Sequence, residues 1–383
     1  MKCMSARTSV LDAYRAGLEL GESLRAIAPE AVVLFPSVHY SEEFEDLFAG
    51  LYDGLENRDL LVVGGTGDGF YEGDSVESIG VGAMAFHGGN GVRWGCAMSG
   101  QGAVENPRVA AAECASNLID NMGAMPDLAI TFAPMGCDGT LFAQGIREVM
   151  TSPCVGALTG DDRQFKGGAV LANGRVVGDA AVMLGIRGAF HHATRLGNGY
   201  APVGALGVIE QAEGTTIHRI SGLTATAFVR KQWGAPMSEE DLYAFCFGVF
   251  SEKELVAIRS PNTFDNASGS IRLFGSVPEG TEISICSTTK EQMLSVAADM
   301  AVACSGQISK PTGAFVISCA GRKWLLAEEI HSELKALGHA LPDDLPILGL
   351  PSFGEFSPPN GVTSISTNFH NVTCVMTLFG EAP

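Results

Sequence analysis

Three short glycine-containing turns each follow an apolar run of the sequence. They span residues 64–69 (GGTGDG), 156–161 (GALTGD) and 349–355 (GLPSFGE). Glycines let backbone N–H groups approach a polar or anionic ligand closely, although each turn taken alone is more simply structural. No Lys-Ser or Lys-Thr pair follows the first turn, so it is not a P-loop. Because ligands in such sheets lie beyond the carboxyl ends of strands, we expect the three turns to line one cavity.

Charged side chains in and near these turns could recognise a zwitterion. The planar guanidinium of Arg322 could hold a carboxylate through two hydrogen bonds, while Asp68 and Glu355 could hold an ammonium group. An internal ion pair between Arg322 and Glu355 is the alternative, and it would leave no room for a ligand. His370 either contacts the ligand or only satisfies backbone groups. The tandem acids at 161–162 are most simply surface charge.

Motifs for catalysis are absent from the sequence. It contains no G-x-S-x-G, H-E-x-x-H, C-x-x-C-H or Walker pattern, so no catalytic residue is predicted from a motif. None of its ten cysteines forms a C-x-x-C pair, which leaves no support for a zinc or iron–sulfur site. One catalytic alternative stays open, because the fold could bring Cys319 and His370 together as nucleophile and base.

Composition excludes two classes of partner. The chain has 383 residues and a formal net charge of −19, whereas binding to nucleic acid requires clustered Lys and Arg. No apolar run approaches the roughly 18 residues needed to cross a bilayer, and the N-terminal sequence is too polar for a signal peptide. We therefore expect a cytoplasmic protein that neither binds nucleic acid nor inserts into a membrane.

Hydrophobic periodicity predicts an α/β fold with mixed β-sheets covered by helices. The order strand, helix, strand, hairpin occurs over residues 31–98 and again over 128–187, which predicts an internal duplication of the N-terminal region. The expected elements there are helices over 8–28, 41–56, 105–122 and 139–149, strands over 31–35, 60–63, 128–132 and 154–156, and hairpins joining 79–86 to 92–98 and 168–172 to 176–186.

Loop-rich sequence over residues 188–235 predicts a seam between two regions. The N-terminal region is expected to span residues 1–220, and a C-terminal α/β region, residues 221–383, is expected to pack against it. The elements expected beyond the seam are one over 239–250, strands over 256–259, 270–274, 282–286, 313–319, 347–348 and 372–379, and helices over 289–304 and 324–337.

Four segments in a fixed order match a known set of motifs. Residues 62–69 (VVGGTGDG) join a strand to a Gly-rich polar turn, residues 318–322 (SCAGR) form a Cys-x-Gly-Arg turn, residues 347–355 contain Gly-x-x-x-x-Gly-Glu, and residues 369–373 (FHNVT) complete the set. Over residues 30–377 the chain therefore resembles the FIST domain family, a sensory module with N-terminal and C-terminal regions. Phe70 departs from the family, which usually has Glu there, and this implies a ligand that is less cationic or differently placed.

The resemblance implies a non-catalytic sensory protein that binds a small, amino-acid-like metabolite and signals through a separate kinase or cyclase. The motifs supply the expected ligand-binding residues, which are Thr66, Asp68, Gly69, Arg322, Ser352, Gly354, Glu355 and His370. The cofactor is left open. Some stand-alone members of the family resemble haem-based nitric-oxide sensors, so haem with an axial ligand such as His370 is one alternative. A hydrolase or transferase that uses Cys319 is another.

Overall fold

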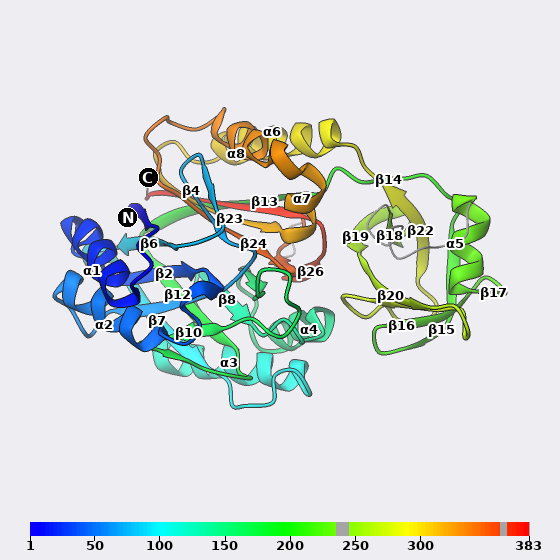
Figure 1. Cartoon of the computed structure of the whole chain (residues 1–383), viewed down its shortest axis with the longest axis horizontal. Coiled ribbons are helices and arrows are strands. Elements are labelled where there is room, and N and C mark those ends of the chain that lie inside the picture. Colours follow the sequence, from blue (N-terminus) through cyan, green and yellow to red (C-terminus); the bar gives the residue numbers. More distant parts are fainter. Residues whose placement is uncertain (235–244, 361–365, 383) are drawn as a thin grey trace.

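Four β-sheets contain the strands of the described chain, which in this computed structural model comprises residues 1–234, 245–360 and 366–382. Three six-stranded sheets build the body of the molecule, and helices cover the outer side of each (Figure 1). A nine-stranded sheet forms a separate lobe, at the right of the figure. The predicted α/β fold with mixed sheets covered by helices is therefore confirmed.

The first sheet has the strand order β1-β6-β2-β3-β10-β11, with β2 parallel to β3. Its helices α1 and α2 touch through glycines spaced four residues apart, and a Cβ atom at Gly17 would lie only 2.0 Å from the carbonyl oxygen of Leu47. The bounds are β1 (Lys2–Thr8), α1 (Ala13–Leu24), η1 (Arg25–Ile27), β2 (Ala31–Pro36), η2 (Val38–Tyr40), α2 (Phe44–Leu55), β3 (Leu61–Gly65), β6 (Val81–His87), β10 (Val170–Ala172) and β11 (Arg175–Val176).

The second sheet has the order β7-β12-β8-β9-β25-β26, with β8 parallel to β9. Helices α3 and α4 cover it, and α4 begins where the carboxylate of Asp138 accepts the N–H of Thr140, as an N-cap does. The bounds are η3 (Gly89–Gly91), β7 (Val92–Met98), α3 (Pro107–Met122), β8 (Leu128–Ala133), α4 (Gly139–Val149), β9 (Cys154–Leu158), β12 (Val182–Gly188), β25 (Glu355–Ser357) and β26 (Asn368–His370).

The third sheet has the order β13-β27-β23-β24-β4-β5, with β23 parallel to β24. Helices α6, α7 and α8 cover it, and Thr289 with Gln292 forms a capping box at the start of α6. The bounds are β4 (Phe70–Glu72), β5 (Ser75–Glu77), β13 (Phe190–Gly197), α6 (Lys290–Ser305), β23 (Pro311–Cys319), α7 (Ala320–Leu326), η5 (Ala327–Glu329), α8 (Ile330–Gly338), β24 (Ile347–Ser352) and β27 (Cys374–Glu381).

These three sheets are copies of one repeating unit. Along the chain each unit runs strand, helix, strand, helix, strand, hairpin, strand, over residues 2–87, 92–188 and 190–381. Each hairpin leaves its own unit and extends the sheet of another: β4–β5 joins the third sheet, β10–β11 the first and β25–β26 the second. The exchange is cyclic, so the three units hold one another in a closed ring.

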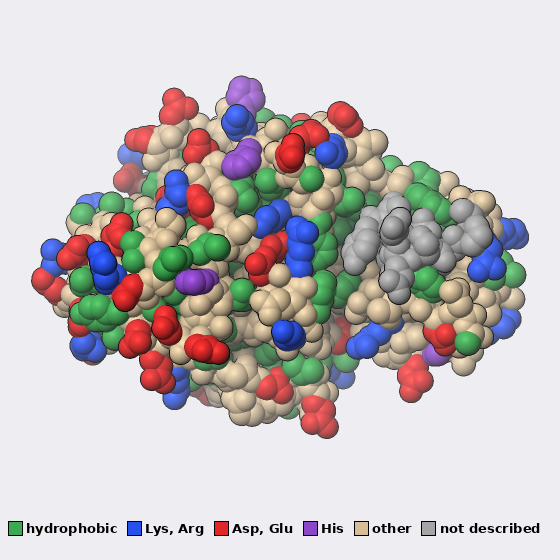
Figure 2. All heavy atoms as spheres, viewed as in Figure 1, with side chains coloured by type: hydrophobic (Ala, Val, Ile, Leu, Met, Phe, Trp, Pro, Cys, Tyr) green, Lys and Arg blue, Asp and Glu red, His purple; other side chains and the backbone are tan. Residues whose placement is uncertain are grey.

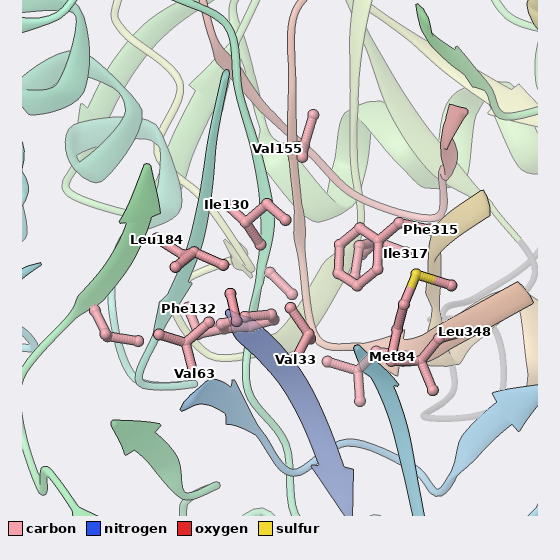
Figure 3. Packing of buried hydrophobic residues seen from close by; sticks show 14 of the residues in the cluster. Val33, Val63, Met84, Ile130, Phe132, Val155, Leu184, Phe315, Ile317 and Leu348 are labelled. Atoms are coloured by element: carbon pink, nitrogen blue, oxygen red, sulfur yellow. The ribbon is translucent and has the colours of Figure 1, made fainter. Parts of the chain in front are cut away.

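The inner faces of the three sheets share one apolar core (Figure 3). Val33, Ile130 and Phe315 come from the central parallel strands of different repeats and are all buried. The alternate residues of the same strands pack against the helices outside. Strands buried on both faces must be apolar throughout, which explains runs such as Ala31–Pro36.

One glycine recurs at the same place in each repeat, where the third strand passes the central strand. A Cβ atom would lie 1.9 Å from the carbonyl oxygen of Leu34 at Gly64, 1.9 Å from that of Thr131 at Gly156, and 2.9 Å from that of Val316 at Gly349. The parallel strands can therefore approach one another only because no side chain is present.

The inserted lobe interrupts the third repeat between β13 and α6 (Figure 1). Its strand order is β19-β18-β22-β15-β16-β21-β20, with β14 on β22 and β17 on β16, and α5 packs on its core. The bounds are β14 (Ala201–Pro202), β15 (Gly207–Glu213), β16 (Thr216–Ile220), β17 (Leu223–Thr224), α5 (Ala225–Trp233), β18 (Cys246–Ser251), β19 (Glu254–Arg259), β20 (Pro261–Asp265), β21 (Ser270–Leu273) and β22 (Glu282–Ser287).

The predicted duplication is confirmed, because β6-β2-β3 and β12-β8-β9 have the same order, but its limits differ and a third copy exists. The predicted hairpin of 79–86 with 92–98 is wrong: β6 pairs with β1 and β2, whereas β7 pairs with β12. The helix predicted over 8–28 starts only at Ala13, after Asp12 caps it. Of the element predicted over 239–250, residues 239–244 lie outside the described residues, and the remainder falls largely in strand β18. The division at residue 220 stays a prediction.

No helix among the described residues combines the length and the apolar character needed to span a bilayer.

The close approach of β3 to β2 predicts that Gly64→Ala lowers the free energy of unfolding by about 1–3 kcal/mol, since the added methyl group has no space. Gly338→Ala in α8 is the matched control, because a Cβ atom there meets nothing within 4 Å, and alanine favours a helix by about 1 kcal/mol. Urea unfolding of both variants checks the prediction. Equal stability of Gly64→Ala and the wild type would contradict it.

Candidate functional site

The three glycine-containing turns meet at one end of the body and bond to one another. The hydroxyl of Thr66 donates to the carbonyl oxygen of Gly160 at 2.5 Å and accepts the N–H of Ala169 at 2.8 Å. The N–H of Asp68 donates to the carbonyl oxygen of Pro351 at 2.9 Å. The turns therefore converge, but their polar groups mainly join the repeats to one another. The prediction that all three turns line one cavity is not met, because only the turn 349–355 contributes lining residues to the cavity described next.

A cavity of about 560 Å³ lies beside these turns, between the third repeat and the inserted lobe. The body supplies Arg163, Phe165, Cys319, Ala320, Gly321, Trp324, Leu325, Ser352, Phe353, Asn371 and Val372, and the lobe supplies Tyr200, Cys246, Ser260, Pro261, Asn262 and Phe274. Acidic side chains are scattered over the face shown in Figure 2, whereas a group of Lys and Arg side chains lies on the body next to the lobe. The cavity is the candidate functional site.

The floor of the cavity is formed where β23 and β24 end side by side, at Cys319 and Ser352. The hydroxyl of Ser352 donates to Glu355 at 2.7 Å, and the N–H of Thr373 donates to the same carboxyl group at 3.2 Å. Burial raises the pKa of Glu355 to about 8 despite these bonds, and burial also raises the pKa of the Cys319 thiol well above its ordinary value. Burial therefore favours the neutral forms of both groups.

The segment 369–373 forms the wall beside this floor. Val372 adopts a left-handed φ of 49°, which a β-branched residue rarely does, and its N–H reaches the thiol of Cys319. His370 is buried, 3.4 Å from the carbonyl oxygen of Ser357, and burial with the charge of Arg259 lowers its pKa to about 4. His370 does not line the cavity, and its neutral ring sits behind the wall.

Arg322 forms an internal ion pair, but its partner is Glu333 in α8. Its Nε and Nη2 both donate to Oε1 of Glu333, at 2.9 and 2.6 Å, and both side chains are buried. Its other donors reach the carbonyl oxygens of Asn198 at 2.8 Å and Met293 at 3.1 Å. Arg322 thus ties the chain entering the lobe to helices α6 and α8, and it is not part of the cavity lining.

Asp68 is buried and joins several elements of the body. It accepts bonds from Lys323 Nζ at 3.2 Å, from Arg163 Nε at 3.3 Å and from the indole N–H of Trp324. Burial opposes ionisation, but a hydrogen bond with Asp162 and the charge of Lys323 outweigh it, so the pKa of Asp68 is lowered. The same hydrogen bond raises the pKa of Asp162 to about 6.

Two lining residues, Arg163 and Phe165, belong to the loop 159–168 and were not predicted from the sequence, which indicated only the turn 156–161. The carboxylate of Asp161 accepts the N–H groups of Phe165 at 2.8 Å and of Gly167 at 2.9 Å. This cap holds Asp162, Arg163 and Phe165 in left-handed conformations. Asp161 is therefore a buried structural anchor and not the surface charge that the sequence suggested. Its place after a strand-end glycine was the one available signal.

The remaining predicted residues have structural surroundings. Gly69 has a φ of 76°, and a Cβ atom there would lie 2.0 Å from the carbonyl oxygen of Glu77. Gly354 has a φ of 151° and lies against the ring of Phe369. Of the eight residues that the motifs supplied, Ser352 lines the cavity and Glu355 lies directly beneath it through their hydrogen bond.

Arg259 connects the lobe to the body. Its Nη1 donates to the carbonyl oxygen of Phe369 at 3.0 Å and its Nη2 to the hydroxyl of Thr140 at 3.2 Å, while its guanidinium lies 5.4 Å from the centre of the Phe369 ring. Within the described residues its buried Nε has no hydrogen-bond partner. Burial lowers the pKa of Arg259 to about 10, so it keeps its charge in the interface at neutral pH.

Comparison with protein families identifies the chain. The model of the FIST N domain matches residues 30–223, and that of the FIST C domain matches residues 228–358. The chain belongs to the FIST family, as the motifs of its sequence predict. No curated protein sequence matches it.

Similar solved structures include a cyanuric acid hydrolase described as an evolutionary innovation by structural concatenation, with 9% identity and a TM-score of 0.38. The cyanuric acid hydrolase from A. caulinodans has 9% identity and a TM-score of 0.39, and both alignments cover 100% of this chain and 99% of the other. The PurLQS structure from Thermotoga maritima has 11% identity and a TM-score of 0.22, covering 100% of this chain and 72% of that one. At these scores the likeness supports no inference about this chain's function.

Haem does not fit the residues of this cavity well. Its lining, as far as the structure describes it, contains no histidine, and His370 lies behind the wall. The thiols of Cys246 and Cys319 and the phenol of Tyr200 do line it, and such groups can bind haem iron. Burial raises the pKa of all three and so disfavours the anionic forms that would bind the iron.

The buried ion pair predicts that Arg322→Ala lowers the free energy of unfolding by about 3–5 kcal/mol. Glu333 would keep its hydrogen bond from the hydroxyl of Ser318 but would be left buried without a charged partner. Urea unfolding measures this value. The control is Lys290→Ala, which removes an exposed pair with Glu329 and should cost less than about 1 kcal/mol. An Arg322→Ala variant as stable as the control would show that the guanidinium does not hold the fold.

The raised pKa of Glu355 predicts a stability that depends on pH. Its folded pKa of about 8 lies above the ordinary value of 4.5, so the stability it contributes is complete below pH 4.5 and is lost as the pH rises towards 8. The loss should amount to at most about 1.4 kcal/mol per pH unit. Glu355→Gln keeps the side chain neutral, so urea unfolding from pH 5 to 8 should give a flatter profile than the wild type. Parallel profiles would mean that Glu355 is ionised throughout.

Proposed function

We propose that this protein is a sensory protein that binds a small metabolite in the cavity between the third repeat and the inserted lobe, and that it signals through a separate partner such as a kinase or cyclase. The observation that carries the proposal is the cavity of about 560 Å³ with walls from both parts of the molecule. Sites for small molecules have volumes of about 300–1,000 Å³. Membership of a family of sensory domains supports the same role.

The chemistry of the lining supports binding without catalysis. Aromatic and aliphatic side chains dominate it, and the polar side chains of Ser260, Asn262, Ser352 and Asn371 are uncharged. Such a site offers apolar contact to the body of a ligand and hydrogen bonds that fix its orientation. Cys319 is the candidate nucleophile if the protein is a hydrolase or transferase. Its raised pKa, however, keeps it in the thiol form, which is less reactive than the thiolate.

The placement of the cavity supports signalling through movement of the lobe. A ligand that contacts both Trp324 on the body and Asn262 on the lobe favours the arrangement in which the two approach each other. The hydrogen bonds of Arg259 with Phe369 and Thr140 lie on the same boundary. Closure of one part of a protein against another around a ligand is a common form of switching.

An amino-acid-like ligand is one form of this proposal, but its contacts would differ from those that the motifs imply. Arg322 already holds Glu333, and Asp68 already holds Lys323. A ligand carboxylate would then be bound by Arg163 at the rim, and the neutral Glu355 would leave an ammonium group without a charged partner. The geometry thus favours a ligand with an apolar body over a compact zwitterion.

The test is a thermal-shift screen of the full chain with pools of small metabolites. A ligand present at a hundred times its Kd should stabilise the protein by about 2.7 kcal/mol, which is a measurable rise in Tm. Asn262→Trp, which fills the cavity from the half-buried lobe side, should abolish the shift. Asn266→Trp, in an exposed turn of the same lobe, is the matched control and should retain it.

If every pool leaves the Tm of the folded protein unchanged, the proposed function is wrong. A shift that Asn262→Trp preserves would place the ligand elsewhere on the molecule and would equally exclude this cavity.

A further inference from the structure

The cavity combines an aromatic wall, a neutral floor and one arginine in its lining, and a second arginine lies behind the opposite wall. Phe165, Trp324 and Phe353 pack edge to face, with ring centres 6.2, 5.6 and 6.0 Å apart. Two of these rings belong to the third repeat, and Phe165 comes from the loop 159–168 of the second. All three rings line the cavity, and Phe165 is 48% exposed, so this wall can contact the ring of a flat ligand.

Arg163 is held at the rim of this wall. Its guanidinium lies 4.8 Å from the centre of the Trp324 ring, and its Nε contacts Asp68 at 3.3 Å. Its side chain is 55% exposed, so the planar group is reachable from the cavity that it lines. Arginine offers a fork of donors suited to a carboxylate, and it can stack on an aromatic ring at the same time.

Arg259 supplies positive charge behind the opposite wall. It contacts the carbonyl oxygens of Ile258 and Phe369 and the hydroxyl of Thr140, none of which carries a charge. The next residue, Ser260, lines the cavity and donates its N–H to Asn371, another lining residue, at 3.3 Å. The buried charge therefore lies one residue away from the cavity wall.

Acidic groups lie close to both arginines, but none of them is part of the cavity lining. Asp68 is paired with Lys323 as well as with Arg163, and Asp162 shares a hydrogen bond with Asp68. On the other side, Asp138 accepts the N–H groups of Thr140 and Ser276 and caps α4. Glu355 lies beneath Ser352 and outside the lining.

We propose that the cavity selects a flat aromatic monoanion, whose ring lies against the Phe165, Trp324 and Phe353 wall and whose carboxylate is bound by Arg163. This inference rests on the proposed function and names the class of ligand. It makes Arg163 the residue that determines specificity for the anion, while the aromatic wall binds charged and neutral rings alike.

The test uses 2-naphthoate and 2-naphthamide, which share one ring system and differ in charge, and isothermal titration of the full chain with each. The naphthoate should bind more tightly. Arg163→Gln should weaken naphthoate binding about tenfold, equal to about 1.4 kcal/mol, and should change naphthamide binding less than twofold. Arg163→Lys should restore part of the loss. Arg175→Gln, at an exposed arginine of strand β11, is the matched control and should change neither.

The possible outcomes distinguish an error in the proposed ligand class from an error in the proposed function. Equal weakening of both probes by Arg163→Gln, or unchanged naphthoate binding, would overturn the role of Arg163 while small-molecule binding stands. If neither probe binds but the folded chain still responds to a metabolite pool, the aromatic-anion class is wrong and the proposed function stands. Binding of both probes that Asn262→Trp leaves unaffected would exclude the cavity itself, and with it the proposed function.

Discussion

The ladder hydrogen bonds between β4 and β24, β10 and β3, and β25 and β9 join the three repeats in a closed ring. Each hairpin covers a strand edge that its host sheet would otherwise expose, and an exposed edge invites pairing with another chain. Because each repeat completes another, no repeat can fold to its final form alone. The strand-end turns are brought together by this exchange, since each turn leads into an exchanged hairpin.

Asymmetry within the ring creates the candidate site. The first two repeats pass from their edge strand to their first helix through short loops, whereas the third carries the whole lobe there. The lobe stands over the ends of β23 and β24, so the strand ends at Cys319 and Ser352 become the floor of a cavity. Arg322 and Arg259 hold the two sides of this junction together by contacts that cross it.

The sequence predicted the parts of the fold that depend on local pattern. Apolar runs such as Ala31–Pro36 and the glycines of residues 64–69 indicated strands and their ends, and the convergence of three turns followed from strand direction. The third repeat could not be found this way, because the lobe separates β13 from α6 by nearly a hundred residues of chain. Hairpin exchange was equally hidden, since Glu355 pairs with Ala157 across about two hundred residues.

The site was predicted less completely than the fold. The motif residues Arg322 and Thr66 have the chemistry of ligand contacts, but their donors are taken by Glu333 and by Gly160. Which partner a buried donor finds depends on packing and not on spacing. Arg163 and Phe165 could not be predicted, because no motif marks them. Their loop reaches the cavity through the hydrogen bonds that its N–H groups donate to Asp161, and these bonds cannot be read from the sequence.

A crystal of the full chain saturated with 6-bromo-2-naphthoate tests directly whether the end of the third repeat beneath the lobe is the ligand site. We expect an anomalous bromine peak beside Trp324 and Phe353, inside the cavity. A second hollow of the molecule is lined in part by Arg93, Trp94 and Arg187. Its side chains are similar, so it is the alternative position for the probe. A bromine peak confined to that hollow, with none in the cavity, would show that the cavity is not the ligand site.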